Sequence, residues 1–205
     1  IISTAQYFLP QVLKQFRKKH SEYKIILEIR NREQLVELLR DGQIDIAIMG
    51  LVPKEIDTKV YTITNHPHVF ISNLDHSLTH LKKIRPEALN DFDFISREKG
   101  SGTRAHMETF IQDHDIHPNI IMEMSSNESI KQAVIAGLGI SFVSQHTIAS
   151  EIKHGQLKVL EVMNTPINRK WHVVTLNPMS INRSVELLKD FILDQSEIII
   201  SKLLS

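Results

Sequence analysis

The 205-residue sequence contains no cysteine, which excludes disulfide bonds, thiolate zinc sites and a cysteine nucleophile and fits a reducing compartment such as the cytoplasm. It has no excess of either charge, because 24 Lys and Arg residues balance 24 Asp and Glu residues. Proteins that bind nucleic acid usually carry a basic excess, so the balance argues against nucleic-acid binding by this chain. No apolar run approaches the roughly 20 residues of a membrane span, and we expect no membrane partner.

What is present is typical of a soluble globular protein, with 41% hydrophobic and 23% charged residues. Short apolar runs alternate with amphipathic segments, which predicts an α/β fold with mostly parallel strands. Amphipathic or capped patterns predict helices at 5–20, 31–42, 103–115, 127–137 and 182–195. Apolar runs predict strands at 23–30, 44–50, 68–72, 92–96, 119–124, 139–144 and 170–176.

The two halves of the chain share one order of elements, which predicts two similar Rossmann-like α/β lobes. The last helix is expected to return to the first lobe, so two crossover segments would join the lobes, near 70–75 and 173–178. Lobe I would then comprise residues 1–72 and 178–205, and lobe II residues 73–177. A ligand cleft is expected at the carboxyl ends of the strands.

The stretch EKGSGTR, residues 98–104, uses two of only seven glycines. Gly100 and Gly102 permit positive φ and a close backbone approach, and Ser101 and Thr103 add hydroxyls at the start of a helix. Free N–H groups at a helix N-terminus suit phosphate or carboxylate, and Arg104 could add a bidentate charge. The alternative is an ordinary strand-to-helix turn capped by Thr103.

Two other helix starts carry similar side chains. Ser3 and Thr4 precede the first helix, and Ser126, Asn127 and Glu128 open another. Each of these starts alone is more often a simple cap. Their repetition in equivalent places favours a shared ligand.

The sequence shows no catalytic signature and no marked metal site. It lacks the G-x-S-x-G, Walker A, H-E-x-x-H and complete G-x-G-x-x-G patterns, so we expect neither an enzyme nor a bound cofactor. Among eleven histidines, pairs such as His66 and His68 have metal-ligand spacing, but no third ligand accompanies them. In GLGIS, Gly137 follows a helix and precedes a strand, which favours a helix C-cap over phosphate binding.

Several long runs resemble the effector-binding domain of LysR-type transcriptional regulators. They are STAQYFLP, NREQLVELLRDGQIDIAIMG, HPHVFIS, REKGSGTRAHME and MEMSSNESIKQAVIAGLGISFVSQHT. These runs span nearly the whole chain in order and are most similar to the subgroup that controls the RuBisCO operon. The resemblance implies a type II periplasmic-binding-protein-like fold. It also implies an N-terminal winged helix-turn-helix that binds DNA, which we expect to be absent from a chain that opens at Ile1.

The resemblance also implies a small-molecule effector in the interlobe cleft and no catalytic residue. In the RuBisCO subgroup the effectors are phosphorylated metabolites or reduced nicotinamide nucleotide (NADPH). Carried over by position and joined with Arg104 from the turn, the expected effector-binding residues are Ser3, Thr4, Gly50, Arg97, Ser101, Gly102, Thr103, Arg104, Asn127 and Ser144.

The family further implies a cytoplasmic homodimer, which is a tetramer in the full-length regulator. Its dimers commonly join the helix of residues 5–20 and the neighbouring strand to the helix of residues 128–136 of a second copy. The alternative function is the solute-binding protein of a transporter, which shares the fold and acts outside the cytoplasm.

Overall fold

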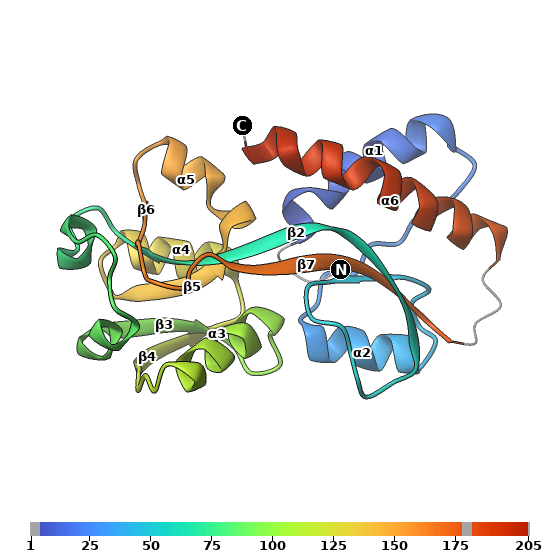
Figure 1. Ribbon diagram of the computed structural model, residues 1–205. Coiled ribbons are helices and arrows are strands. Elements are labelled where there is room, and N and C mark those ends of the chain that lie inside the picture. Colours follow the sequence, from blue (N-terminus) through green and yellow to red (C-terminus); the bar gives the residue numbers. More distant parts are fainter. Residues whose placement is uncertain (1–4, 178–181, 205) are drawn as a thin grey trace. The chain divides into compact units, whose positions relative to one another are not determined.

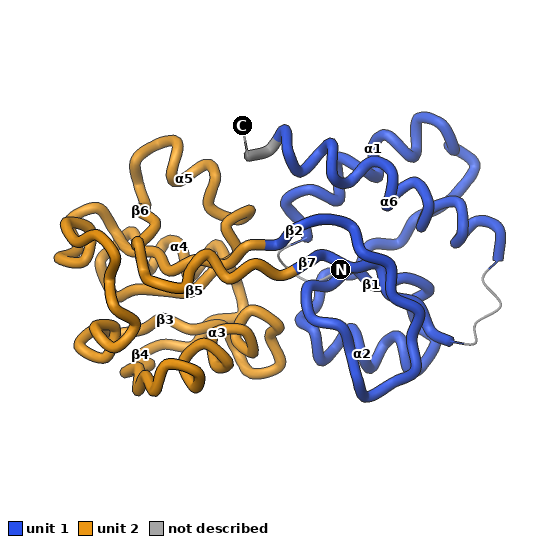
Figure 2. The backbone as a smooth tube through the Cα atoms, viewed as in Figure 1, with its two compact units in different colours: residues 1–66, 170–205 blue, residues 67–169 orange. Residues whose placement is uncertain are grey.

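A computed structural model describes residues 5–177 and 182–204 of the chain. The chain divides into two compact units, residues 1–66 with 170–205 and residues 67–169 (Figure 2). Both changes of unit fall within long strands, β2 (Thr58–Ser72) and β7 (Ile167–Leu176), which pass from one unit to the other.

The first unit, coloured blue in Figure 2, packs helices against a short antiparallel pair of strands. Strand β1 pairs with β7, and Ala47 lies opposite Val174. Phe8 and Trp171 are buried in its core and meet edge to face, with ring centroids 5.4 Å apart. Helices α1 and α6 lie side by side (Figure 1). Its other elements are η1 (Ala5–Tyr7), α1 (Leu9–Lys19), α2 (Arg32–Arg40), β1 (Ala47–Met49) and α6 (Arg183–Leu204).

The second unit holds parallel strands with a helix on each face. Strand β3 pairs in parallel with β4 and β5, whereas β2 pairs antiparallel with β5 and β6. Its elements are η2 (Ser77–His80), η3 (Pro86–Asp91), β3 (Asp93–Arg97), α3 (Gly102–Asp113), β4 (Asn119–Met124), α4 (Asn127–Ile135), β5 (Ile140–Ser144), η4 (Gln145–Thr147), α5 (Ala149–Lys153) and β6 (Lys158–Val159).

Alternation along these strands produces two separate apolar cores in the second unit. Phe94 packs with Met107 and Phe110 of α3, while its neighbour Ile95 packs with Ile130 of α4. Successive side chains of a strand point to opposite faces, so both faces must be apolar when each is covered by a helix. This explains why β3 and β5 each have apolar residues at adjacent positions, Phe94 with Ile95 and Phe142 with Val143.

Local signals at the helix ends are confirmed. Asn31 caps α2 in a capping box with Gln34, in which each side chain accepts a hydrogen bond from the other residue's backbone N–H. Gly137 has a φ of 80° directly after α4, and Leu138 N–H donates to the carbonyl of Ala133. That pattern closes the helix as a C-cap, as expected for a glycine in the left-handed region.

Three sequence expectations about strands are wrong. Within the described residues, 23–30 form no strand ladder and only Arg30 takes part in a bridge, although their composition is typical of a strand. A strand needs a hydrogen-bonded neighbour along its length as well as the pattern. The sheet is mixed rather than mostly parallel, since the long strands that change unit run antiparallel to their paired neighbours β1, β5 and β6. Strand β2 begins at Thr58, ten residues before the predicted start at 68.

The helices differ from expectation in two places. The short helix α5 was not predicted, and α6 continues through the apolar C-terminal run to Leu204. No helix within the described residues has the length and hydropathy needed to cross a membrane.

Candidate anion-binding site

The turn between β3 and α3 has one glycine in the left-handed region and one in the helix. Gly100 has a φ of 82°, which L side chains rarely adopt, so the predicted need for glycine is met there. Helix α3 begins at Gly102 with Ser101 as its N-cap, rather than near Thr103 as expected. The hydroxyls of Ser101 and Thr103 therefore lie before and within the first helical turn.

Helices α2 and α4 begin with side-chain N-caps, whereas α3, like α1 and α5, has none. Ser101 makes no side-chain cap hydrogen bond, although it is only 5% exposed, and Thr103 is 6% exposed. The first N–H groups of any α-helix have no acceptor within the helix. Buried hydroxyls and uncapped N–H groups thus gather at one helix end, an arrangement suited to an anion.

A second helix begins at the same edge of the sheet. Because β3 and β4 are parallel neighbours, the helices that follow them, α3 and α4, both start at their carboxyl ends. Ser126 caps α4 by accepting a hydrogen bond from the N–H of Ser129, so this cap is occupied. Asn127 is 3% exposed, and its amide nitrogen has no hydrogen-bond partner within residues 5–177 and 182–204.

The buried guanidinium of Arg97 fixes the orientation of that amide. Arg97 Nη1 donates to Asn127 Oδ1 at 2.9 Å. A guanidinium has donors only, so the amide oxygen must face Arg97 and the amide NH₂ must point away from it. Asn127 therefore offers a buried donor that has no acceptor among the described residues.

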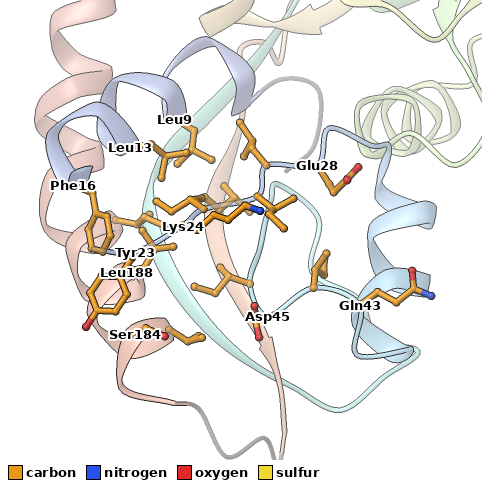
Figure 3. A pocket seen from close by; sticks show the side chains of 18 residues that line it. Leu9, Leu13, Phe16, Tyr23, Lys24, Glu28, Gln43, Asp45, Ser184 and Leu188 are labelled. Carbon is orange, nitrogen blue, oxygen red and sulfur yellow. The ribbon is translucent and has the colours of Figure 1, made fainter. Parts of the chain in front are cut away.

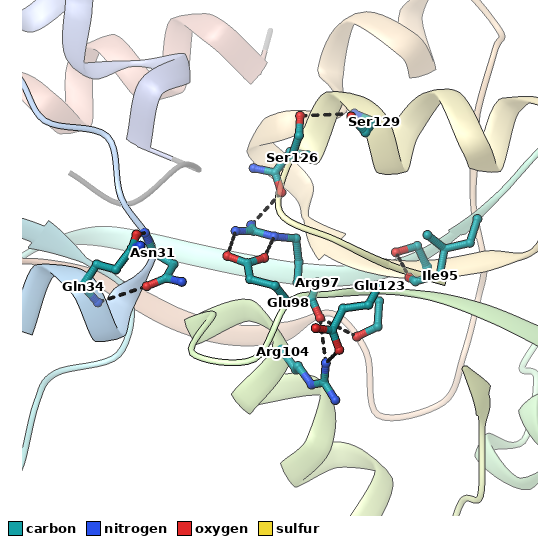
Figure 4. A network of polar contacts seen from close by, with 12 residues as sticks. Asn31, Gln34, Ile95, Arg97, Glu98, Arg104, Glu123, Ser126 and Ser129 are labelled. Atoms are coloured by element: carbon teal, nitrogen blue, oxygen red, sulfur yellow. Dashed lines mark hydrogen bonds and ion pairs between the residues drawn. The ribbon is translucent and has the colours of Figure 1, made fainter. Parts of the chain in front are cut away.

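Both candidate arginines near the turn are already paired with carboxylates (Figure 4). Arg97 holds Glu98 through two bonds, Nε to Oε2 at 2.7 Å and Nη2 to Oε1 at 3.0 Å. Arg104 donates from Nε to Glu108 at 2.7 Å and from Nη1 to Glu123, and the Arg104 hydrogen bond lowers the pKa of the Glu123 carboxyl. Neither guanidinium is the free positive charge that the sequence suggested for Arg104.

The structure adds residues that the sequence did not single out as ligand-binding. His68 of β2 lies opposite Ser144 of β5, and the ring of His106 from α3 meets the His68 ring edge to face at 5.2 Å between centroids. Both histidines are buried, and Ser144 is buried beside them. Burial, and then the nearby positive charge of Arg169, lower the pKa of His106 to about 4, so its imidazole is neutral at pH 7.

The remaining predicted residues belong to the first unit. Ser3 and Thr4 lie outside the described residues. Gly50 packs against the ring of His66, where a Cβ would come 2.6 Å from Nδ1, so this position requires glycine for packing alone. Their part in ligand binding stays a prediction.

The histidines form no metal centre in the part of the chain that the structure describes, where no group of three His, Asp or Glu side chains converges. His66 stacks instead on Trp171 at 3.8 Å between ring centroids. Its partner in the HPH motif, His68, stacks on Phe142.

The first unit contains a separate cavity of about 340 Å³ (Figure 3). Leu9, Leu13 and Phe16 of α1 line it together with the segment 23–28. None of the predicted ligand-binding residues that the structure describes lines this cavity. The segment 23–28 that borders this cavity belongs to the predicted strand 23–30, which forms no ladder within the described residues.

Comparison with known families adds a match over most of the chain. Residues 1–197 match the family model described as "LysR substrate binding domain". A curated relative, the HTH-type transcriptional regulator CbbR of Sinorhizobium medicae, is 40% identical over 195 residues, which cover 94% of this chain and 62% of that protein. The RuBisCO operon transcriptional regulator of Acidithiobacillus ferrooxidans is 40% identical over 84% of this chain and 56% of that protein. The chain thus spans about three fifths of its curated relatives.

A solved structure matches at the level of the whole fold. The regulatory domain of CcmR from Synechocystis PCC6803, in complex with 2-PG, superposes with a TM-score of 0.92 at 35% identity. The match covers 96% of this chain and 94% of that chain. This likeness establishes the type II periplasmic-binding-protein-like fold, and the relatives confirm the resemblance to regulators of the RuBisCO operon.

Proposed function

Because the chain belongs to the LysR substrate-binding domain family, we propose that it is the effector-sensing part of a DNA-binding transcription regulator. Its effector is a small phosphorylated metabolite, bound where β3 and β4 lead into α3 and α4. DNA binding resides in an N-terminal domain outside this chain. The relatives are transcription regulators, which disfavours the transporter alternative and an enzyme.

The observation that supports the proposal is the group of buried polar side chains at the N-terminus of α3. Ser101 and Thr103 are buried, the helix has no side-chain cap, and Asn127 adds a buried amide donor that no described residue accepts. Leaving such donors unsatisfied costs about 1–3 kcal/mol each, which an anion with several acceptor oxygens would recover. The complex of the CcmR regulatory domain with 2-PG supports a phosphorylated ligand for a relative at 35% identity.

Titration calorimetry with 2-phosphoglycolate, phosphoenolpyruvate, a sugar bisphosphate, NADPH and sulfate tests the proposal. We expect saturable binding of a phosphorylated metabolite and a loss of roughly 5- to 30-fold in affinity for Thr103→Val, which keeps the shape and removes one hydroxyl. Thr109→Val is the matched control, since Thr109 lies exposed on the same helix and its hydroxyl bonds only the carbonyl of Ala105. Unchanged affinity in Thr103→Val would contradict the site. Binding of NADPH and of none of the other compounds would show that the effector is a nicotinamide nucleotide and not a small phosphorylated metabolite.

We also propose that the chain forms a homodimer in the cytoplasm, as the family resemblance implies. The segment after α1 carries exposed apolar side chains suited to such a contact, since Ile26 is 75% exposed and Ile29 is 41% exposed. Sedimentation velocity at tens of micromolar should show a dimer, and Ile26→Asp should shift it towards monomer. A monomeric wild-type domain at that concentration would contradict the proposal.

A further inference from the structure

We propose that Arg169, rather than Arg97 or Arg104, supplies the positive charge that binds the anionic effector. The proposal rests on the proposed function of the α3 turn as an anion site. It adds a specificity-determining residue from β7, a strand that contributes nothing to the turn itself.

Carboxylates of the protein already pair with the two arginines closest to the turn. Arg97 is 3% exposed and uses Nε and Nη2 on Glu98 and Nη1 on Asn127. Arg104 uses Nε on Glu108 and Nη1 on Glu123 and on the carbonyl of Arg97. An anion that approached either guanidinium would also meet a paired carboxylate, so the net attraction would be small.

Arg169 lies on the face of the sheet that α3 covers. Strands β2 and β7 are hydrogen-bonded neighbours, and the rings of His66 and Trp171 stack across them at 3.8 Å. Two residues further along β2 is His68, and two residues back along β7 is Arg169. Side chains return to the same face every second residue, so Arg169 and His68 share one face.

Two histidines, His68 and His106, link that face of the sheet to the start of α3. His68 pairs with Ser144 and lies 5.2 Å from the ring of His106. His106 is three residues after Thr103 on α3, and residues three apart lie on the same side of a helix. Both side chains are buried, so the helix presents Thr103 and His106 to the sheet face that carries Arg169.

Arg169 has no carboxylate partner in the part of the chain that the structure describes. Its Nε is buried without a hydrogen-bond partner, and no ion pair reaches its guanidinium from any described residue. The buried Nε2 of His106 also has no partner among the described side chains. Burying part of a guanidinium without a carboxylate partner costs folding free energy, and an anion that binds to it would recover that cost. Arg169 thus has the donors and the charge that a phosphate or carboxylate group requires.

Calorimetry on Arg169→Gln, Arg97→Gln and Arg104→Gln with 2-phosphoglycolate as the probe tests this assignment. We expect Arg169→Gln to lose roughly 10- to 150-fold in affinity, the range for a charge-assisted hydrogen bond, and to lose more than either other variant. Arg169→Lys should recover part of the loss, because it restores the charge without the planar fork. Lys170→Gln is the matched control, since it removes an exposed charge from the next position of the same strand.

The outcomes separate this inference from the proposed function. If wild-type protein binds and Thr103→Val weakens binding, but Arg169→Gln does not, the anion site stands and the role of Arg169 is wrong. A greater loss in Arg104→Gln than in Arg169→Gln would also overturn it. If the wild type binds none of the phosphorylated anions, both fail. Thermal unfolding without ligand checks folding, and Arg169→Gln should be no less stable than the wild type because the Arg169 guanidinium has no hydrogen bond or ion pair to lose among the described residues.

Discussion

At the scale of single residues, side chains of one type differ in role because their neighbours differ. Arg97 is paired with Glu98 and orients Asn127, whereas Arg169 has no carboxylate partner among the described residues. The sequence shows that both positions are arginine but not which partners each has. Charge at a site is therefore a property of the contacts and not of the residue type.

His106 gives a prediction at this scale, because burial and the charge of Arg169 lower its pKa from 6.5 to about 4. Above pH 6.5 the histidine is neutral in both folded and unfolded states. Between pH 6.5 and 4 the unfolded state takes up a proton that the folded state does not, so stability falls by about 3 kcal/mol over this window. Urea unfolding at pH 7 and pH 4.5 should show a smaller fall for His106→Gln than for the wild type.

The control for this prediction is His117→Gln, since the His117 side chain is 82% exposed. That variant should follow the wild-type pH dependence. His146, whose pKa burial also lowers to about 4, keeps part of the acid sensitivity in every variant. An identical fall in His106→Gln and wild type would contradict the burial argument.

At the scale of elements, some helices begin with a side-chain cap and others do not. We expect substitutions at the first kind to change stability, and substitutions at the start of α3 to change effector binding. Asn31 and Gln34 complete a capping box on α2, whereas Ser101 leaves α3 without a side-chain cap. Asn31→Ala should cost about 1 kcal/mol in unfolding free energy and leave effector affinity unchanged. Ser101→Ala should cost little stability and should weaken effector binding. The reverse pattern would show that Ser101 is a structural cap after all.

A buried ion pair ties α4 to the segment that follows β5. Lys131 Nζ donates to Glu151 Oε1 at 2.7 Å and to the carbonyl of Thr147 at 3.0 Å, and its side chain is 3% exposed. Lys131→Met leaves Glu151 without this cation, and we expect a loss of about 3–5 kcal/mol in unfolding free energy. Denaturant unfolding measures it, and adding Glu151→Leu to Lys131→Met should recover part of the loss.

A surface pair is the comparison for that prediction. Arg30 and Glu28 form an ion pair at 2.7 Å with side chains 46% and 39% exposed. Arg30→Met should change the unfolding free energy by less than about 1 kcal/mol, because exposed pairs contribute little. Equal losses in Arg30→Met and Lys131→Met would contradict the role of burial.

At the scale of the whole molecule, effector binding should appear as added stability. A ligand that binds only the folded state adds about 2.7 kcal/mol at 100 times its dissociation constant. For a chain of this size that corresponds to a rise in Tm of roughly 5 to 10 °C. Differential scanning fluorimetry should show the rise with 2-phosphoglycolate and not with equal concentrations of chloride. A rise of the same size with every anion would indicate general salt stabilisation instead.

The sequence by itself determined the features that depend on neighbours along the chain. Asn31, Gln34 and Gly137 define helix ends through local hydrogen bonds and backbone conformation, so their roles follow from spacing alone. The apolar runs of β3 and β5, and the Gly-Ser-Gly-Thr turn before α3, predicted the layers of the second unit and the place of the candidate site. The turn and strand β5 also lie within the runs that resemble LysR-type regulators.

Only the tertiary structure decided which distant residues meet. Arg169, His68 and His106 come together through the pairing of strands and the packing of α3, and no local pattern encodes that register. The same reason explains residues 23–30, whose composition is typical of a strand but which form no strand ladder with another described segment. Local hydrogen bonds and backbone preferences define helix ends and turns, whereas strand pairing and the charge and hydrogen bonding of a site depend on which segments pack together.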